Sequence, residues 1–254
     1  LNYPQVFIEY LDSLSGDVRP ERIALLGRND IYGEDSAAAW HDFVDEIDDI
    51  EIVFDERFEV GSTDLAPAVR PMHNTNADVV ACNSYAAGSQ LFVQAVADVG
   101  LDPDFIWANV GPQVPSWIDA LEGTGEYAFG STPYAYSVPT DANEELFDIA
   151  QEEYGELPHY SFGFAAIQFD IYQQAIEEVG EIDQEAIADA FREGSFSSVT
   201  GDGFEFEDNY IGDNAPMFVT QVQGEEIPIV YPSDSQTAEP VAPLPDEWPE
   251  QDWP

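Results

Sequence analysis

The chain contains no lysine. Its 254 residues carry six Lys plus Arg against 52 Asp plus Glu, a formal net charge of −46 at pH 7. Without lysine the chain offers neither a phosphate-loop lysine nor a Schiff base. Because so few cations could not neutralise a phosphate backbone, we do not expect nucleic acid to be a partner.

The excess of acid opposes compact folding at ordinary ionic strength, but at about 1 M salt the Debye length falls to roughly 3 Å. An acidic disordered segment would contain few aromatics, whereas 13% of these residues are aromatic and 44% are hydrophobic. The acids are spread over every segment and no EF-hand loop pattern occurs, which disfavours a nucleic-acid mimic or a calcium-binding array. The composition therefore favours a folded protein with an acidic surface, from a halophilic, archaeon-like source.

Signatures of enzymes and metal sites are missing or weak. The chain has one cysteine, Cys82, inside an apolar run, where we expect it to be a buried hydrophobe. The histidines, at positions 41, 73 and 159, are too far apart for a His-x-x-x-His pair. The segment 123–128 fits G-x-G-x-x-A, but it follows a predicted helix, so we interpret it as a turn. We expect no catalytic residues, no metal and no cofactor.

The sequence shows no membrane-spanning run and no export signal pattern. Because the chain begins with Leu, we interpret it as a processed form or a fragment whose targeting information lies upstream.

Short apolar runs alternate with helical patterns in the first half of the chain, which predicts an α/β fold with a doubly wound parallel sheet. The predicted strands are 22–27, 50–54, 78–82, 105–110 and 127–131, with helices over 34–47 and 89–99. After Pro139 the pattern predicts helices over 140–154, 160–179 and 183–192, and then a β-meander over 204–207, 217–222 and 227–231.

This order of elements predicts two lobes joined by crossovers, with a cleft. We assign 1–134 and 203–232 to one α/β lobe and 135–202 to the helical part of the other. The acidic, proline-rich tail, 233–254, is expected to be extended or only partly ordered.

Aromatic and polar residues follow three predicted strands. They are Asp30, Tyr32 and Gly33 after the first, Asn83, Ser84 and Tyr85 after the third, and Asn109 and Gln113 after the fourth. Open α/β sheets bind ligands outside the carboxyl ends of their strands, so these groups predict a site for a small polar ligand with an apolar part. The alternative, that the two tyrosines only pack the loops, stays open.

Several segments resemble, in order, those of the solute-binding proteins of branched-chain amino acid ABC transporters. They are RIALLGRNDIYGEDSAAAWHDFVDE, ADVVACNSYAAGSQLFVQAVADVGLDP, FGFAAIQFDIYQQAIEEVG, FSSVTGDGFEFEDN and FVTQVQGEEIPIVYP. The resemblance implies the type I periplasmic-binding fold and no enzymatic activity. It implies that the protein captures a small amino-acid-like or amide solute in a cleft between two lobes and delivers it to a permease. It also implies an extracellular position at the cell surface, with membrane contact only through a possible lipid anchor upstream. The alternative is a sensor or receptor domain of the same fold.

The resemblance assigns ligand contacts to Tyr32 and Tyr85, and a first-lobe aromatic contact to the region of Phe162. It places Asn109, with Gln113 nearby, where amino-acid binders have a glutamate that pairs with the ligand ammonium. An amide offers a dipole instead of a charge, which makes a neutral amide or urea-like ligand more plausible than an amino acid. Ser84 completes the predicted ligand-binding set.

Such relatives begin with a further half-domain, which builds most of the first lobe and has no counterpart here. We therefore expect the first lobe to be incomplete, with Phe162, Phe169 and Tyr172 exposed.

Overall fold

The structure is a computed structural model that describes residues 2–114, 116–155, 158–206 and 216–249. The chain forms two compact units. Unit 1 comprises Leu1–Thr132 and Phe218–Pro254, and unit 2 comprises Pro133–Met217.

Unit 1 is built on a seven-stranded sheet in the order β2-β1-β3-β4-β5-β8-β9. Its strands are β1 (Arg22–Arg28), β2 (Glu51–Phe58), β3 (Val79–Asn83), β4 (Phe105–Trp107), β5 (Phe129–Thr132), β8 (Phe218–Gln221) and β9 (Ile229–Tyr231). The first five in this order are parallel, and β8 and β9 add antiparallel strands beside β5. The predicted α/β fold with a parallel sheet is confirmed, although β4 is shorter than the predicted strand over 105–110.

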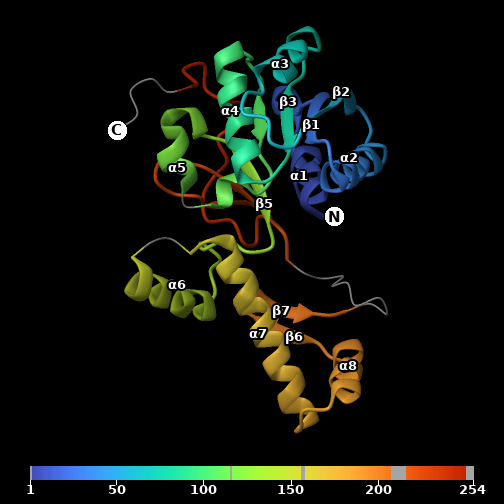
Figure 1. Cartoon of the computed structure of the whole chain (residues 1–254), viewed down its shortest axis with the longest axis vertical. Coiled ribbons are helices and arrows are strands. Elements are labelled where there is room, and N and C mark those ends of the chain that lie inside the picture. Colours follow the sequence, from blue (N-terminus) through green and yellow to red (C-terminus); the bar gives the residue numbers. More distant parts are fainter. Residues whose placement is uncertain (1, 115, 156–157, 207–215, 250–254) are drawn as a thin grey trace. The chain divides into compact units, whose positions relative to one another are not determined.

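Helices cover the sheet of unit 1, with α1 and α2 on one side and α4 on the other (Figure 1). They are α1 (Asn2–Ser13), α2 (Ile31–Val44), α3 (Ala66–Val69), α4 (Ala86–Val99) and α5 (Ser116–Leu121), with short 3-10 turns at Gly16–Val18, Arg70–Asn74, Gly111–Gln113 and Glu122–Gly125. The last turn agrees with the interpretation of the glycine pattern at 123–128. Because both faces are covered, every residue of β3 and β4 is buried.

The core of unit 1 is aromatic and centres on Phe7 of α1. The ring of Phe7 lies 6.0 Å from Trp107, 6.2 Å from Trp40 and 5.5 Å from Phe129, measured between centroids. All four side chains are fully buried. Helix α1, which supplies this central ring, was not predicted from the sequence. Cys82 is fully buried, as predicted.

Unit 2 contains α6 (Asp141–Tyr154), α7 (Tyr160–Val179), α8 (Gln184–Glu193) and a two-stranded sheet of β6 (Phe196–Ser198) and β7 (Gly201–Phe204). Two of these helices directly follow residues whose side chains cap them. The Thr140 hydroxyl accepts a hydrogen bond from the Asn143 N–H, and the Asp183 carboxylate accepts from the N–H groups of Glu185 and Ala186. The helix predicted over 160–179 matches α7.

The predicted β-meander is wrong in one respect, because β7 pairs with β6 and not with the later strands. Phe204 of β7 and Phe196 of β6 pack with Ile171 of α7 and Ile187 of α8 in one buried cluster. This packing groups residues 203–206 with the helices of unit 2, whereas the sequence analysis assigned them to the other lobe.

Over the part that the structure describes, 233–249, the tail contains no helix or strand, which agrees with the extended chain predicted for it. Hydrogen bonds hold it to unit 1, from the Thr237 N–H to the Ile229 carbonyl at 2.8 Å and from the Leu244 N–H to the Asp104 carbonyl at 2.9 Å. Residues 250–254 lie outside the described part. The lobe identities given to the two units by the resemblance remain predictions.

Three aromatic residues of α7 were expected to be exposed, and two of them are. Phe169 is 75% exposed and Tyr172 is 55% exposed. Phe162 is only half-buried, with its ring 6.4 Å from that of Tyr154 in an edge-on arrangement. Among the described residues, no helix combines the length and apolarity needed to cross a membrane.

Candidate functional site

The candidate site lies at the carboxyl edge of the sheet in unit 1. Strands β1, β3 and β4 are adjacent and parallel, so their carboxyl ends share one edge. The chain then continues into α2 after β1, into α4 after β3 and into a 3-10 turn after β4. Tyr32, Tyr85 and Asn109 all lie in these connections.

The two tyrosines stack on each other. Their ring centroids are 4.7 Å apart and the ring planes differ by 14°. Tyr32 is half-buried in the first turn of α2, and Tyr85 immediately precedes α4 and is 49% exposed. The sheet edge therefore presents an aromatic surface that is partly open to solvent.

Asn109 joins the tyrosines through a hydrogen bond. Its amide Nδ2 donates to the Tyr32 hydroxyl. The side chain is fully buried, and Oδ1 has no hydrogen-bond partner among the described residues. The backbone at Asn109 has φ of 49°, a left-handed conformation that asparagine tolerates better than most residues. Tyr32 thus contacts the other two predicted site residues, Tyr85 through ring stacking and Asn109 through a hydrogen bond.

Arg28, the last residue of β1, also contacts this site and was not predicted from the sequence. Its guanidinium Cζ lies 4.7 Å from the centroid of the Tyr85 ring. Nε and Nη2 donate to Oδ2 of Asp30 at 2.9 and 2.5 Å. The sequence feature that could have indicated Arg28 is its position at the end of a predicted strand, because the chain has only six Arg plus Lys. We refer to Arg28, Tyr32, Tyr85 and Asn109 as the tyrosine cluster.

The tyrosine cluster has neutral hydrogen-bonding groups and one cation, Arg28, which pairs with Asp30 beside the cluster. Burial raises the pKa of the Tyr32 hydroxyl, which therefore keeps its proton at neutral pH. The hydrogen bond from Arg28 holds the pKa of the Asp30 carboxyl below its ordinary value, so this group stays charged. The two charges cancel, and the neutral groups of the cluster are the hydroxyl of the half-buried Tyr32, the fully buried Asn109 amide and the partly exposed Tyr85 ring.

Two other predicted residues make their contacts elsewhere in unit 1. The Gln113 amide Nε2 donates to the Thr220 hydroxyl of β8. Ser84 is buried against the first turn of α4, where its Oγ lies 2.1 Å from the point that a Cβ on Gly88 would occupy. The structure therefore assigns both side chains packing contacts. Phe162 belongs to unit 2.

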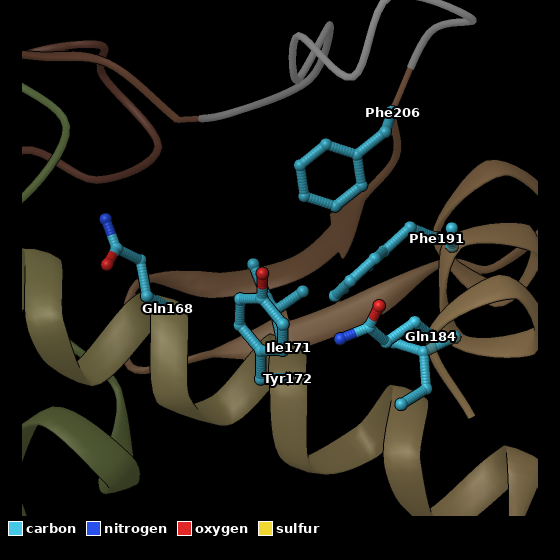
Figure 2. A pocket seen from close by; sticks show the side chains of 8 residues that line it. Gln168, Ile171, Tyr172, Gln184, Phe191 and Phe206 are labelled. Carbon is cyan, nitrogen blue, oxygen red and sulfur yellow. The ribbon is translucent and has the colours of Figure 1, made fainter. Parts of the chain in front are cut away.

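Unit 2 contains an apolar hollow of about 770 Å³ between α7 and α8. Figure 2 shows rings of Tyr172, Phe191 and Phe206 around it, with Gln168 and Gln184 on either side. Residues predicted for the site do not line it. Over the described residues there is also no group of three His, Cys, Asp or Glu side chains that could hold a metal.

Comparison with known proteins agrees with this fold. A family model described as "Periplasmic binding protein" matches residues 5–226. A Leu/Ile/Val-binding protein homolog 7 from Brucella abortus is 23% identical over 252 residues, covering 94% of this chain and 63% of the relative. The chain thus spans less than two thirds of the length of this curated relative.

Solved structures show the same architecture. A putative branched-chain amino acid ABC transporter protein from Silicibacter pomeroyi has a TM-score of 0.79 and 16% identity, covering 93% of this chain and 66% of its own. The branched-chain amino acid binding protein LivJ from Streptococcus pneumoniae, in complex with isoleucine, has a TM-score of 0.74 and 17% identity, covering 95% and 65%. The match to the family model over most of the chain shows that this protein belongs to the periplasmic binding protein family.

Proposed function

We propose that this chain serves in solute capture for an ABC importer, binding a small amino-acid-like or amide solute at the tyrosine cluster and delivering it to a permease. The observation that carries the proposal is the contact of Tyr32, Tyr85 and Asn109 at the carboxyl edge of the sheet. Open α/β sheets bind their ligands at this edge. The Brucella relative is named a Leu/Ile/Val-binding protein homolog, and the Streptococcus structure holds isoleucine.

The proposed activity is binding without chemistry, without a metal or cofactor, and outside the cell. The family match supports an extracellular position. A lipid anchor upstream of this chain would hold the protein at the cell surface near its permease.

The chemistry of the tyrosine cluster favours a neutral amide over an amino acid. Tyr32 and Asn109 offer a neutral hydroxyl and a neutral amide, and the charges of Arg28 and Asp30 cancel. An amino acid ammonium would find no uncompensated carboxylate in the cluster and would lose a charge-assisted hydrogen bond, worth about 1.5–3 kcal/mol. The apolar part of the solute would pack on the part of Tyr85 that Tyr32 and Arg28 leave exposed.

Calorimetry in molar salt with two matched probes tests this proposal. Isovaleramide carries the leucine side chain on a neutral amide, and leucine carries it on a zwitterion. We expect isovaleramide to bind more tightly than leucine. The variant Asn109→Asp adds a carboxylate of the same shape and should shift the preference toward leucine by about tenfold or more.

Asn74→Asp is the matched control, because this exposed residue on the 3-10 turn Arg70–Asn74 gains the same charge outside the cluster. It should leave both affinities unchanged. Failure of the wild type to bind either probe, or any amide, urea or amino acid in a wider screen, would overturn the proposed function. Tighter binding of leucine than of isovaleramide would overturn the solute class.

A further inference from the structure

We propose that Arg28 is a positioning residue of the solute site, which holds the Tyr85 ring against Tyr32 in the orientation that a solute meets. This inference rests on the proposed function. Arg28 and Tyr32 each contact the ring of Tyr85 at 4.7 Å, measured from the guanidinium Cζ and from the Tyr32 centroid to the Tyr85 centroid. The ring is thus held by a cation and by a second aromatic ring.

Tyr85 needs such support because of where it lies. It precedes the first residue of α4, so the helix does not fix its side chain, and 49% of the residue is exposed. An exposed aromatic side chain at a loop position can adopt several rotamers, and each costs little energy to reach. A cation placed over the ring favours one of them by about 0.5–2 kcal/mol.

Arg28 is itself held in place by Asp30. The carboxylate Oδ2 accepts from Nε and Nη2 of Arg28, while Oδ1 accepts from the Gly33 N–H at 3.1 Å. Asp30 is the N-cap of α2, the helix that carries Tyr32. Hydrogen bonds therefore connect Arg28, Asp30 and the first turn of α2, which carries Tyr32.

The backbone geometry brings Arg28 close to the first turn of α2. A Cβ on Gly33 would lie 1.9 Å from the Arg28 carbonyl oxygen, so the chain before α2 can approach β1 only because residue 33 is glycine. The side chains of Arg28 and Asp30 are 21% and 28% exposed, which shields their pairing partly from solvent. In molar salt, where exposed ion pairs are screened, a shielded pair and a ring contact keep more of their strength.

A purely structural role for Arg28 makes a different prediction from a positioning role. If Arg28 only stabilised the fold, its replacement would lower the melting temperature, and solute affinity would not change while the protein remained folded. If Arg28 positions Tyr85, solute affinity falls in the folded protein. Measurements on folded variants separate the two.

The experiment compares Arg28→Met and Arg28→Lys with the control Arg22→Met, using isovaleramide as the probe in calorimetry. Methionine keeps an unbranched side chain but removes the cation, and lysine keeps the charge but not the planar group. Arg22 begins the same strand and pairs with Glu51 at 2.5 Å, away from the carboxyl edge. We expect Arg28→Met to weaken binding about 2- to 30-fold, Arg28→Lys to lie between, and Arg22→Met to match the wild type.

A second measurement follows the ring directly, through NMR of ring-labelled tyrosine in the solute-free protein. The Tyr85 and Tyr32 ring signals should shift in Arg28→Met and stay in place in Arg22→Met. Unchanged affinity in Arg28→Met, unchanged ring signals, or an equal loss of affinity in Arg22→Met would overturn the inference. If Arg28→Met binds the probe as tightly as the wild type does, the positioning role of Arg28 is overturned and the proposed function stands. If the wild type binds no probe, the result counts against the proposed function itself.

Discussion

The side-chain amide of Gln221 forms a two-sided hydrogen-bonded pair with the backbone of Val241. Its Nε2 donates to the Val241 carbonyl at 2.7 Å, and its Oε1 accepts from the Val241 N–H at 2.8 Å. Gln221 lies in β8 and is fully buried. One side chain therefore gives the tail the pairing that a neighbouring strand would give it.

Replacing Gln221 with Met should release the tail from unit 1. The variant loses both bonds and leaves backbone groups of Val241 without partners, which costs about 1–3 kcal/mol. We expect faster amide hydrogen exchange across 237–244 and a lower free energy of unfolding. The control Gln223→Met removes two bonds from Nε2, to the Glu239 carbonyl and to Oε1 of Gln221, but leaves both bonds between Gln221 and Val241, so it should have a smaller effect. Equal exchange rates in the two variants would contradict the special role of Gln221.

Gly163 allows α7 to pack against Tyr134 within unit 2. A Cβ on this residue would lie 2.0 Å from Cγ of the Tyr134 ring, so even one methyl group requires movement of the ring or the helix. Gly163→Ala should destabilise unit 2 by about 1–3 kcal/mol, although alanine favours helix. Ala166→Gly on the same helix is the control and should cost about 1 kcal/mol, mainly through helix propensity. Stabilisation by Gly163→Ala, measured by chemical denaturation, would show that the close approach is absent in solution.

The sequence could predict the tyrosine cluster in part, because parallel strands place their carboxyl ends together. Tyr32, Tyr85 and Asn109 each follow such a strand, so their proximity followed from topology alone. The contact of Arg28 with Tyr85 depends on the path of two loops, which no periodicity encodes. Gln113 also follows a strand, yet it turns toward Thr220, because the neighbouring antiparallel β8 offers a hydroxyl.

Other elements escaped prediction for similar reasons. Helix α1 precedes the first strand, so the alternation of strands and helices gave no cue to it. The alternating residues 204–207 fit a strand with any partner. The structure instead has β7 at 201–204, and its pairing with β6 accompanies the burial of Phe196 and Phe204. Strand pairing of this kind is a tertiary property, which depends on residues distant in sequence.

The charged form of Asp104 should lower the free energy of unfolding at neutral pH. Burial first, and then the charges of Asp78 and Asp102, raise its pKa. The folded state therefore binds a proton at Asp104 more tightly than the unfolded chain does, so this contribution to stability falls as pH rises through the raised pKa. Asp104→Asn should raise the free energy of unfolding at about pH 7, and the gain should shrink toward about pH 4.

Asp42→Asn is the control for Asp104→Asn, since it removes the same charge from an exposed position on α2. It should give a smaller gain, set by general repulsion alone. Denaturation curves over the pH series provide the measurement. An Asp104→Asn gain that equals that of Asp42→Asn at every pH would show that the local environment of Asp104 has no effect.

Salt should stabilise the whole chain. Among the described residues, Glu126 is the only buried acidic residue, so the other described carboxylates reach solvent and repel one another through it. Lowering the salt from about 1 M to about 0.05 M lengthens the Debye length severalfold, and mutual repulsion then acts across much of the surface. We expect a cooperative fall in melting temperature, measured by circular dichroism across a NaCl series. Sucrose at matched osmolality should not replace the salt, because it does not screen charge, and a melting temperature that stays constant across the series would contradict the halophilic prediction.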